Sequence, residues 1–430
     1  MCRYRQHKLQ QYVWVGWIVL LFAWLGCKAE SQAPPDRKAD STNVPGPALS
    51  TETAPAIPLP LAEQLRRDGW IRLFDGETLF GWTPTGNVDW EVVDQTIRAT
   101  QGEIGFLHTT TMFSDYILQL QFRCDEETNS GVFLHMPLHP QDPTRDCYEV
   151  NIAPPDNPFP TGSLVGRQRV EPPGWQDGWF QLEIQVDGPH IRVKLDEGVI
   201  LEYQDPSDKF LGRGHIGLQH NQGRVQFRDI RLKPLNAHSL FSGRDLAGWT
   251  VKPGLDSEFS VTSEGHMQVI GGKGQIETEG EYDNFVLHVD CQTGAVGLNS
   301  GIFFRCIPGD FWMGYESQIH NGYAGGDRTN PIDCGTGGIF RRQDARRVVA
   351  DDLQWFTKTI VADGPHLAVW VNGYQVSDWI DTRPPHENPR NGRRMAAGTI
   401  ILQGHDPTTN LLFSNFLISP LRQRAPDADL

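Results

Sequence analysis

The sequence predicts an all-β protein made of two tandem antiparallel β-sandwiches of the jelly-roll type. Three observations lead to this prediction: short segments of alternating apolar and polar residues, a composition rich in turn formers, and an internal duplication. The 430 residues include 44 Gly and 30 Pro beside 13 Trp and 21 Phe. This combination is typical of short strands joined by tight turns, and the length indicates more than one domain.

The alternation identifies individual strands. Tyr116–Arg123 and Phe180–Val186 place apolar side chains on one face, as a half-buried strand requires. Asn372-Gly373 lies between two such runs and predicts a hairpin, while Asp196–Gly198 is a weaker turn of the same kind in the first half. A single helical turn is expected at Leu61–Asp68. The remaining signal is that of strands and turns.

The duplication sets the domain organisation. Leu73–Thr83 recurs as Leu240–Thr250, with the Leu-Phe, Gly and Gly-Trp-Thr positions kept. The other repeated pairs, in chain order, are Asn129–Phe133 with Asn299–Phe303, Tyr148–Glu149 with Tyr315–Glu316, Trp179–Phe180 with Trp355–Phe356, Asp187–His190 with Asp363–His366, and Gly217–His220 with Ile401–His405. Because the order and spacing agree, the chain is a tandem repeat. We expect the sandwiches to span 63–235 and 236–424.

The N-terminus carries the only membrane-directed pattern. Three basic residues precede an apolar run, Tyr12–Leu25, and the segment 1–27 therefore predicts a secretory signal. Cys27 directly after Gly26 resembles a lipobox whose cysteine is lipidated, although Trp24 departs from that pattern. A lipoprotein, a plain cleaved signal and an uncleaved anchor all remain open. We expect export to the cell envelope, in the periplasm or at the outer membrane, with membrane attachment through this segment alone.

Residues 28–62 are rich in Ala, Pro, Ser and Thr and predict a disordered linker. The domains that follow hold five cysteines, and export permits disulfides. Cys124–Cys147 and Cys306–Cys334 are the expected pairs, which leaves Cys291 over.

Charge limits the partners. The formal net charge is −15 and the pI about 5.4, which would repel a phosphate backbone, and no basic stripe with interleaved aromatic residues is present. We expect no nucleic-acid partner and favour a neutral small molecule or a glycan. No CxxC motif or His-rich cluster predicts a metal site. Calcium is compatible with sandwich loops, but no loop has enough spaced oxygen ligands to predict it, so no cofactor is expected.

Several motifs together resemble the 3-keto-disaccharide hydrolase domain family. They are the Leu-Phe-Asp-Gly and Gly-Trp positions of Leu73–Thr83, the strand Asn299–Phe303, and the segments Gly314–Ile319, Thr336–Ile339 and Phe413–Ile418. The similarity covers both copies from Trp70 onward. It implies a concanavalin-like and laminin-G-like sandwich, and cleavage of glycosides that carry a ketone at sugar carbon 3. A pair of non-catalytic carbohydrate-binding modules on a surface lipoprotein is the alternative, because many sandwiches only bind sugars.

The implied substrate has a defined chemical weakness. The ketone acidifies the hydrogen on carbon 2, so a base can remove it while the aglycone leaves from carbon 1, and water then adds back. Such a site needs a base, an acid for the leaving oxygen and a donor for the enolate. No nicotinamide is needed if another enzyme supplies the ketone, and no GxGxxG unit follows a strand.

The second copy offers candidates for these roles. Glu316 is the expected acid/base, because alternation places it with Gln318 and His320 on one strand face; the alternative is a face that simply meets water. Arg305 is the candidate enolate donor or a surface ion-pair partner. His405 is the candidate proton shuttle or a structural loop histidine.

Further residues complete the expected site. The substrate-binding candidates beside Gln318 and His320 are Tyr315, Asn299 and Trp312, for which a core position or a turn is the alternative. The first-domain equivalents are Glu149, Asn151, His135 and His220. His135 stands where the second copy has Arg305, so the second copy is the expected active one. A second catalytic carboxylate is not evident, which favours elimination and hydration over two-carboxylate hydrolysis.

Overall fold

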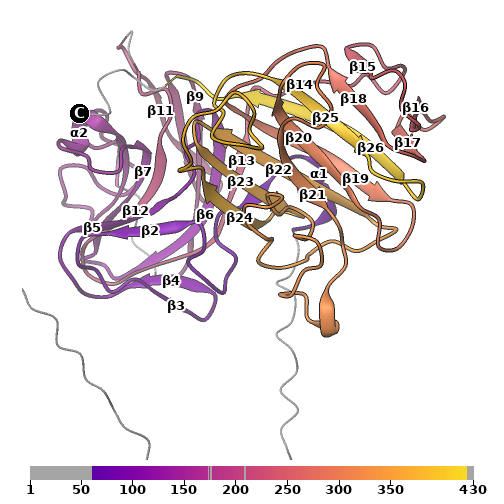
Figure 1. Ribbon diagram of the computed structural model, residues 1–430. Coiled ribbons are helices and arrows are strands. Elements are labelled where there is room, and N and C mark those ends of the chain that lie inside the picture. The colour runs from indigo at the N-terminus through magenta and orange to yellow at the C-terminus, as the bar shows by residue number, and fades with distance from the viewer. Residues whose placement is uncertain (1–60, 173, 175–176, 208–209, 424–430) are drawn as a thin grey trace, which may run out of the picture. The chain divides into compact units, whose positions relative to one another are not determined.

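The computed structural model describes residues 61–172, 174, 177–207 and 210–423. It confirms an all-β protein with two antiparallel sandwiches, one from each copy of the repeat (Figure 1). The signal segment predicted for 1–27 and nearly all of the linker predicted for 28–62 lie outside the described residues. Within the described part of the chain, no helix has the length and apolar character needed to cross a bilayer.

The first sandwich pairs an eight-stranded sheet with a five-stranded sheet. The eight-stranded sheet has the order β11 (Gly198–Gln204), β10 (His190–Leu195), β9 (Phe180–Asp187), β6 (Tyr116–Cys124), β13 (Val225–Pro234), β4 (Thr96–Ala99) and β3 (Glu91–Val93), with β1 (Ile71–Arg72) also paired to β13. The five-stranded sheet has the order β2 (Trp82–Thr85), β5 (Gly105–Thr109), β12 (His215–Gln222), β7 (Asn129–Met136) and β8 (Tyr148–Ile152).

The second sandwich repeats this plan strand for strand. Its eight-stranded sheet has the order β16 (Glu258–Val261), β17 (Met267–Ile270), β26 (Asn410–Pro420), β19 (Phe285–Thr293), β22 (Trp355–Asp363), β23 (His366–Val371) and β24 (Tyr374–Ile380), with β14 (His238–Ser239) paired to β26. Its five-stranded sheet has the order β15 (Trp249–Val251), β18 (Gly274–Thr278), β25 (Thr399–Gly404), β20 (Ser300–Cys306) and β21 (Tyr315–Ile319). Because both orders agree, residues of the two copies can be matched by register.

Local sequence explains the main elements. Strand β6 buries every second residue, as its alternation predicts. The β23–β24 turn is made by Asn372 and Gly373, which have φ of 52° and 77°, so the Asn-Gly pair supplies the two left-handed residues that a tight hairpin needs. The short helices are α1 (Glu63–Arg67), at the predicted helical turn, α2 (Pro143–Asp146) and the 3₁₀ turn η1 (Ala324–Gly326).

Each sandwich has its own core between its sheets, and the two cores meet. Both sandwiches belong to one compact unit. The indole of Trp370, from β23, packs with the apolar core of the first sandwich, and its Nε1 donates to the carbonyl of Arg72 at 2.8 Å. Since β1 also pairs its Arg72 N–H with Gly373, the first strand of one copy is fixed by the last hairpin of the other.

The expected disulfides are not formed: all five described cysteines are free. Cys124 ends β6 in the eight-stranded sheet, whereas Cys147 precedes β8 in the five-stranded sheet. Cys306 packs in a cluster with Phe303, and the Sγ of Cys334 instead donates to the Gln343 carbonyl. Cys124 and Cys147 thus belong to different sheets, and Cys306 and Cys334 each have other neighbours, so neither expected pair forms.

Candidate functional site

Glu316 lies on the outer face of the five-stranded sheet of the second sandwich. On β20 and β25, Ile302 and Leu402 point into the core between the sheets. The alternate positions Phe303 and Ile401 form a separate cluster on the other side. Glu316 is directly opposite Phe303 in the register, so its side chain shares that outer face.

A glycine provides the space for the Glu316 carboxylate. A Cβ added to Gly301 would lie 2.6 Å from Oε1 of Glu316, so the carboxylate lies directly over this glycine. Gln318 is opposite Gly301 on β21, and Gln403 is opposite it on β25 by the register of that pair. The carboxylate is therefore flanked by Gln318 of its own strand and by Gln403 of β25.

Burial changes the acidity of Glu316. Its residue is 5% exposed, and burial raises the pKa of the carboxyl to about 7, although the Arg390 guanidinium and the charges of His405 and Lys358 oppose this rise. A carboxyl with this pKa can give and take a proton near neutral pH. The structure thus gives Glu316 the property expected of an acid/base, as a result of desolvation.

Arg390 supplies the counter-charge, and the sequence did not suggest it. Its Nη2 lies 3.2 Å from Oε2 of Glu316, and its Nε donates to the carbonyl of Trp312 at 3.2 Å. The guanidinium carbon also lies 5.0 Å from the ring centre of Phe303. In the described part of the chain Nη1 has no hydrogen-bond partner, so one pair of N–H groups stays available beside the carboxylate.

His405 follows β25 on the same side. Its imidazole is parallel to the indole of Trp312, with ring centres 6.1 Å apart. Its Nδ1 lies 2.8 Å from Oδ2 of Asp406, whose pKa is lowered to about 2 by the Thr408 hydroxyl and by His405. The ionised Asp406 fixes the orientation of the ring. His405 thus lies against Trp312, and its charge acts on Glu316 without a direct contact between the two side chains in the described residues.

Two buried acceptors remain unpaired here. Oε1 of Gln318 and Oε1 of Gln403 have no hydrogen-bond partner within the described residues. Nε2 of Gln318 donates to Asn299 at 3.0 Å and to Asp333 at 3.2 Å, so Asn299 orients the amide. Unpaired buried acceptors are costly, and hydroxyl groups of a ligand would satisfy them.

Arg305 does not join this group, which corrects its expected role beside Glu316. Its guanidinium is fully buried and donates to the carbonyls of Asp283, Gly364 and Arg394 and to Oδ1 of Asn284. The cause is a bulge in β20, where Arg305 has φ of 48° and the register to β25 shifts. The bulge turns the side chain away from the face of Phe303.

Two other expected residues, Tyr315 and His320, lie away from the Glu316 carboxylate. Tyr315 points into the core and donates to Asp381 at 2.7 Å, so its hydroxyl is already used. His320 follows the end of β21, and its Nδ1 accepts the Gly322 N–H at 3.1 Å, a local loop contact. These two contacts are structural, and neither residue contributes to the geometry around Glu316.

A second carboxylate, Glu277, shares the outer face but is distant. Its register partner on β25 is Ile401, so β20 and β25 separate it from Glu316 on β21. Three inter-strand steps place the two backbones about 14 Å apart. Oε2 of Glu277 accepts from Thr399 at 2.9 Å, and Oε1 accepts the Gly309 N–H at 3.1 Å. Glu277 thus holds the loop that carries Trp312.

The first copy keeps the carboxylate and loses its partners. Glu149 lies over Gly131 as Glu316 lies over Gly301, and burial alone raises its pKa to about 7. No ion pair to Glu149 occurs in the described residues. The Asn151 amide donates to the Phe159 carbonyl.

The two histidines of this copy are structural. His135 occupies the same bulge as Arg305 and bonds the carbonyls of Ser114 and Leu211. His220 matches Gly404 in register, one position before His405, and its ring lies against the carbonyls of Glu103 and Gly223. A shift of one residue changes the face in a strand, so His220 does not correspond to His405.

A family model described as the 3-keto-alpha-glucoside-1,2-lyase-like domain matches residues 69–233 and 236–419. Two solved structures from Parabacteroides distasonis are similar to this chain, and each is provisionally described as a glycosyl hydrolase. The first is 25% identical over 43% of this chain and 100% of its own, with a TM-score of 0.35. The second is 27% identical over 44% of this chain and 85% of its own, with a TM-score of 0.33.

A carbohydrate-binding module of Bacillus subtilis is 14% identical over 35% of this chain and 94% of its own, with a TM-score of 0.28. A search of curated proteins gave no match. Because the family model covers most of the chain in two consecutive regions, the protein belongs to the 3-keto-alpha-glucoside-1,2-lyase-like family and carries two copies of its domain.

Proposed function

We propose that the second sandwich cleaves 3-keto glycosides, with Glu316 removing the hydrogen on carbon 2. The observation that supports this most directly is the buried Glu316 carboxyl, with a pKa of about 7, over Gly301 and beside Arg390. A base that works at neutral pH needs such a pKa. The family description, a 1,2-lyase-like domain, agrees with chemistry between carbons 1 and 2.

The first step forms an enolate. The Glu316 carboxylate takes the proton from carbon 2, and the electrons of that bond move toward the ketone, whose oxygen gains negative charge. The free Nη1 of Arg390 is an available donor for this oxygen, and a guanidinium held by Glu316 and Trp312 needs little reorganisation. The unpaired Gln318 and Gln403 oxygens would accept hydroxyls of the sugar.

The second step releases the aglycone. The ketone re-forms, a double bond appears between carbons 1 and 2, and the bond from carbon 1 to the leaving oxygen breaks. Protonated His405 gives its proton to that oxygen, and Asp406 stabilises the imidazolium. Water then adds: its oxygen bonds to carbon 1, Glu316 returns its proton to carbon 2, and His405 takes the remaining proton. The sum is hydrolysis, and both side chains regain their starting forms.

The test uses a 3-keto α-glucoside with a chromogenic leaving group and deuterium on carbon 2. We expect wild-type protein to release the aglycone and to exchange the deuterium with solvent. Glu316→Gln should lose at least about 100-fold in kcat, while the matched Glu149→Gln should stay near the wild type. Turnover unaffected by Glu316→Gln would refute the assignment. Because Glu316 can return the same deuteron to carbon 2, elimination would be refuted by full retention of deuterium together with the absence of a primary isotope effect on kcat/KM.

Non-catalytic carbohydrate binding is the second candidate, and the two unpaired glutamine oxygens favour it, since they serve binding without chemistry. Saturable binding of the glycoside by wild-type protein without turnover would support this candidate. In either case we propose export to the cell envelope, in agreement with the basic and apolar pattern of 1–27.

A further inference from the structure

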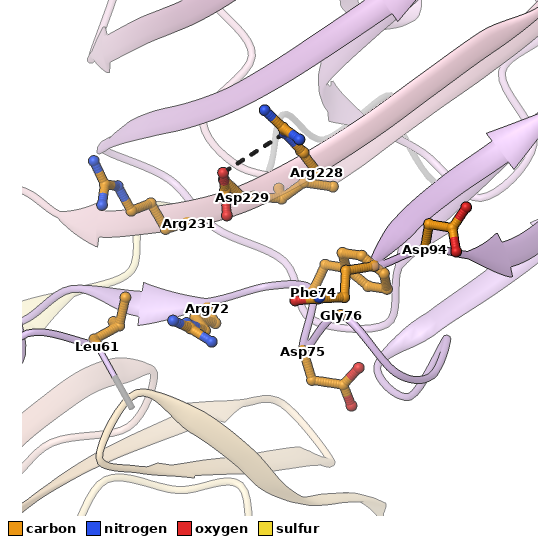
Figure 2. A pocket seen from close by; sticks show the side chains of 11 residues that line it. Leu61, Arg72, Phe74, Asp75, Gly76, Asp94, Arg228, Asp229 and Arg231 are labelled. Carbon is orange, nitrogen blue, oxygen red and sulfur yellow. Dashed lines mark ion pairs between the residues drawn. The ribbon is translucent and has the colours of Figure 1, made fainter. Parts of the chain in front are cut away.

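The first sandwich has a polar cavity that is separate from the face of Glu149. It has a volume of about 270 Å³ and lies against the eight-stranded sheet. Figure 2 shows its lining: β1, the loop that follows it, the turn between β3 and β4, and the part of β13 that carries Arg228 and Arg231. Neither copy's outer carboxylate face contributes to it, so the cavity has no part in the proposed reaction.

Three arginines line this cavity. Arg72 on β1 is directly opposite Arg231 on β13. A bulge with Asp229 at φ of 51° lies between Arg228 and Arg231, and these two pair with Gln121 and Gln119 on β6. Since Gln119 and Gln121 are alternate residues of one strand, the bulge puts both arginines on the same face.

Two of the guanidinium groups are held in place. Nε of Arg228 donates to Gln121 at 2.8 Å, and Nε of Arg231 donates to Gln119 at 2.7 Å. Their planes also lie over tryptophan rings, Trp179 for Arg228 and Trp70 for Arg231. The Nη atoms of both make no hydrogen bond within the described residues. Fixed guanidinium groups with unused Nη donors suit an oxyanion.

Arg72 is the least satisfied of the three. Its side chain has no hydrogen bond or ion pair in the described residues. Burial lowers the pKa of its guanidinium, the charges of Asp229 and Asp75 oppose this, and Arg231 adds to it. Like charges directly opposite each other in a sheet are destabilising. An anion between the strands would remove this cost.

The carboxylates Asp229 and Asp75 favour the charge of Arg72 from a distance, but none of the cavity's carboxylates forms a direct contact with it in the described residues. Both oxygens of Asp75 are used, by the N–H groups of Glu77 and Thr78, the Thr78 hydroxyl and Arg346 of the second sandwich at 2.7 Å. The side chain of Asp229 is 70% exposed and 3.9 Å from Nε of Arg228. Asp94 lies on an exposed turn. Arg72 therefore has no carboxylate within hydrogen-bond distance in the described residues.

The second copy shows that the fold does not need these arginines. Ser239 is opposite Leu417 where Arg72 is opposite Arg231. Ser414 occupies the position of Arg228, before the same bulge at Asn415, which has φ of 52°. The first copy thus has three arginines where the second has two serines and a leucine. This difference indicates a role that is specific to the first sandwich.

We propose that this cavity binds an oxyanion, such as a sulfate or carboxylate group, with Arg72 as its principal partner and Arg228 and Arg231 completing the site. The anion comes either from an acidic saccharide or from a free inorganic ion, since both present the same oxygens. The inference concerns binding alone and does not depend on turnover at Glu316.

The experiment measures the thermal unfolding midpoint of the full chain with sodium sulfate, sodium glucuronate, glucose, and sodium chloride at matched ionic strength. We expect sulfate, glucuronate or both to raise the midpoint by at least about 2 °C more than chloride does. Glucose should have no effect. A response to glucuronate alone identifies a sugar carboxylate, and a response to sulfate alone identifies the inorganic ion or a sulfate ester.

The deciding variant carries Arg72→Ser and Arg231→Leu, the residues of the second copy. It should lose the anion response and, without anion, unfold no lower than the wild type, because the like-charge pair is gone. Arg72→Lys, which keeps the charge without the fork, should weaken the response. Arg224→Ser, which removes an exposed arginine paired with Asp125 outside the cavity, should leave it unchanged. An anion effect equal to that of chloride, or an undiminished response in the double variant, would overturn the proposal.

Discussion

Oε2 of Glu316 lies 3.2 Å from Nη2 of Arg390, and yet burial raises the pKa of this carboxyl to about 7. Desolvation and ion pairing act in opposite directions on the same proton, and desolvation is the larger. The Glu316 carboxyl is therefore about half ionised at neutral pH. A fully exposed glutamate paired with an arginine would be almost completely ionised at this pH.

Removing the arginine should move the pH dependence of turnover. Glu316 acts as a base only when ionised, so the wild-type rate should rise with pH through about 7. Arg390→Met removes the charge that favours the carboxylate, so the rise should move to higher pH and kcat should fall at pH 7. Profiles of kcat against pH measure both effects. Arg341→Met, at an exposed arginine whose guanidinium lies over Phe340, is the control. An unmoved profile in Arg390→Met would contradict the pairing.

Gly301→Ala should disturb the carboxylate without unfolding the sheet. The new Cβ would lie 2.6 Å from Oε1 of Glu316, so that side chain must shift from the position in which it contacts Arg390. We expect kcat/KM to fall at least about tenfold. Gly131→Ala makes the same change under Glu149 of the first copy, at 2.8 Å, and should leave turnover unchanged. Circular dichroism establishes that both variants are folded, and equal losses in both would contradict a single active copy.

Glu149→Gln should stabilise the protein at alkaline pH. The pKa of Glu149 is about 7 in the folded chain and near 4.5 in the unfolded chain, so the folded state binds more protons between these values. The contribution of Glu149 to stability is therefore most favourable below pH 4.5 and is lost as pH rises through 7. The neutral amide avoids this loss, and a gain of about 1 to 3 kcal/mol is expected at pH 8 but not at pH 4. Urea unfolding at the two pH values measures it, and an equal gain at both would contradict the burial effect.

The contribution of Lys358 to stability should change with pH in the direction opposite to that of Glu149. It is fully buried, donates to the carbonyls of Ser317 and Gln318 at 2.8 and 2.9 Å, and burial lowers its pKa to about 8. The unfolded chain holds this proton up to about 10.5, so the contribution of Lys358 to stability should rise between pH 8 and 10.5. Because burial raises the pKa of Cys291 and of the other cysteines and acts in the opposite direction above pH 9, the prediction concerns the difference between wild type and variant. That difference should change with pH for Lys358→Met and stay constant for exposed Lys273→Met, as measured by urea unfolding at pH 7 to 10. A difference for Lys358→Met that does not change with pH would refute the assignment.

For the candidate site, the sequence predicted which residues share a strand face only where the strand is regular. Alternation placed Glu316 and Gln318 together correctly, because β21 is regular. Arg305, expected as an enolate donor at the end of its strand, does not join them, because the bulge in β20 inverts its side. Arg390 was not foreseen, since it is on a loop far along the chain and carries no local pattern. Gln403 was visible in the repeated Leu-Gln motif, which could have identified it.

The sequence by itself determined the duplication, the strand alternation, the family and the glutamate on the outer face, because these depend on local periodicity and on order along the chain. Only the tertiary structure decided which charges meet. Arg390 reaches Glu316 from another loop, Arg305 turns to backbone carbonyls, and Arg72 is opposite Arg231 across two strands. Side chains separated in sequence are brought together by sheet register and bulges, and burial at those places then sets the acidity of each group.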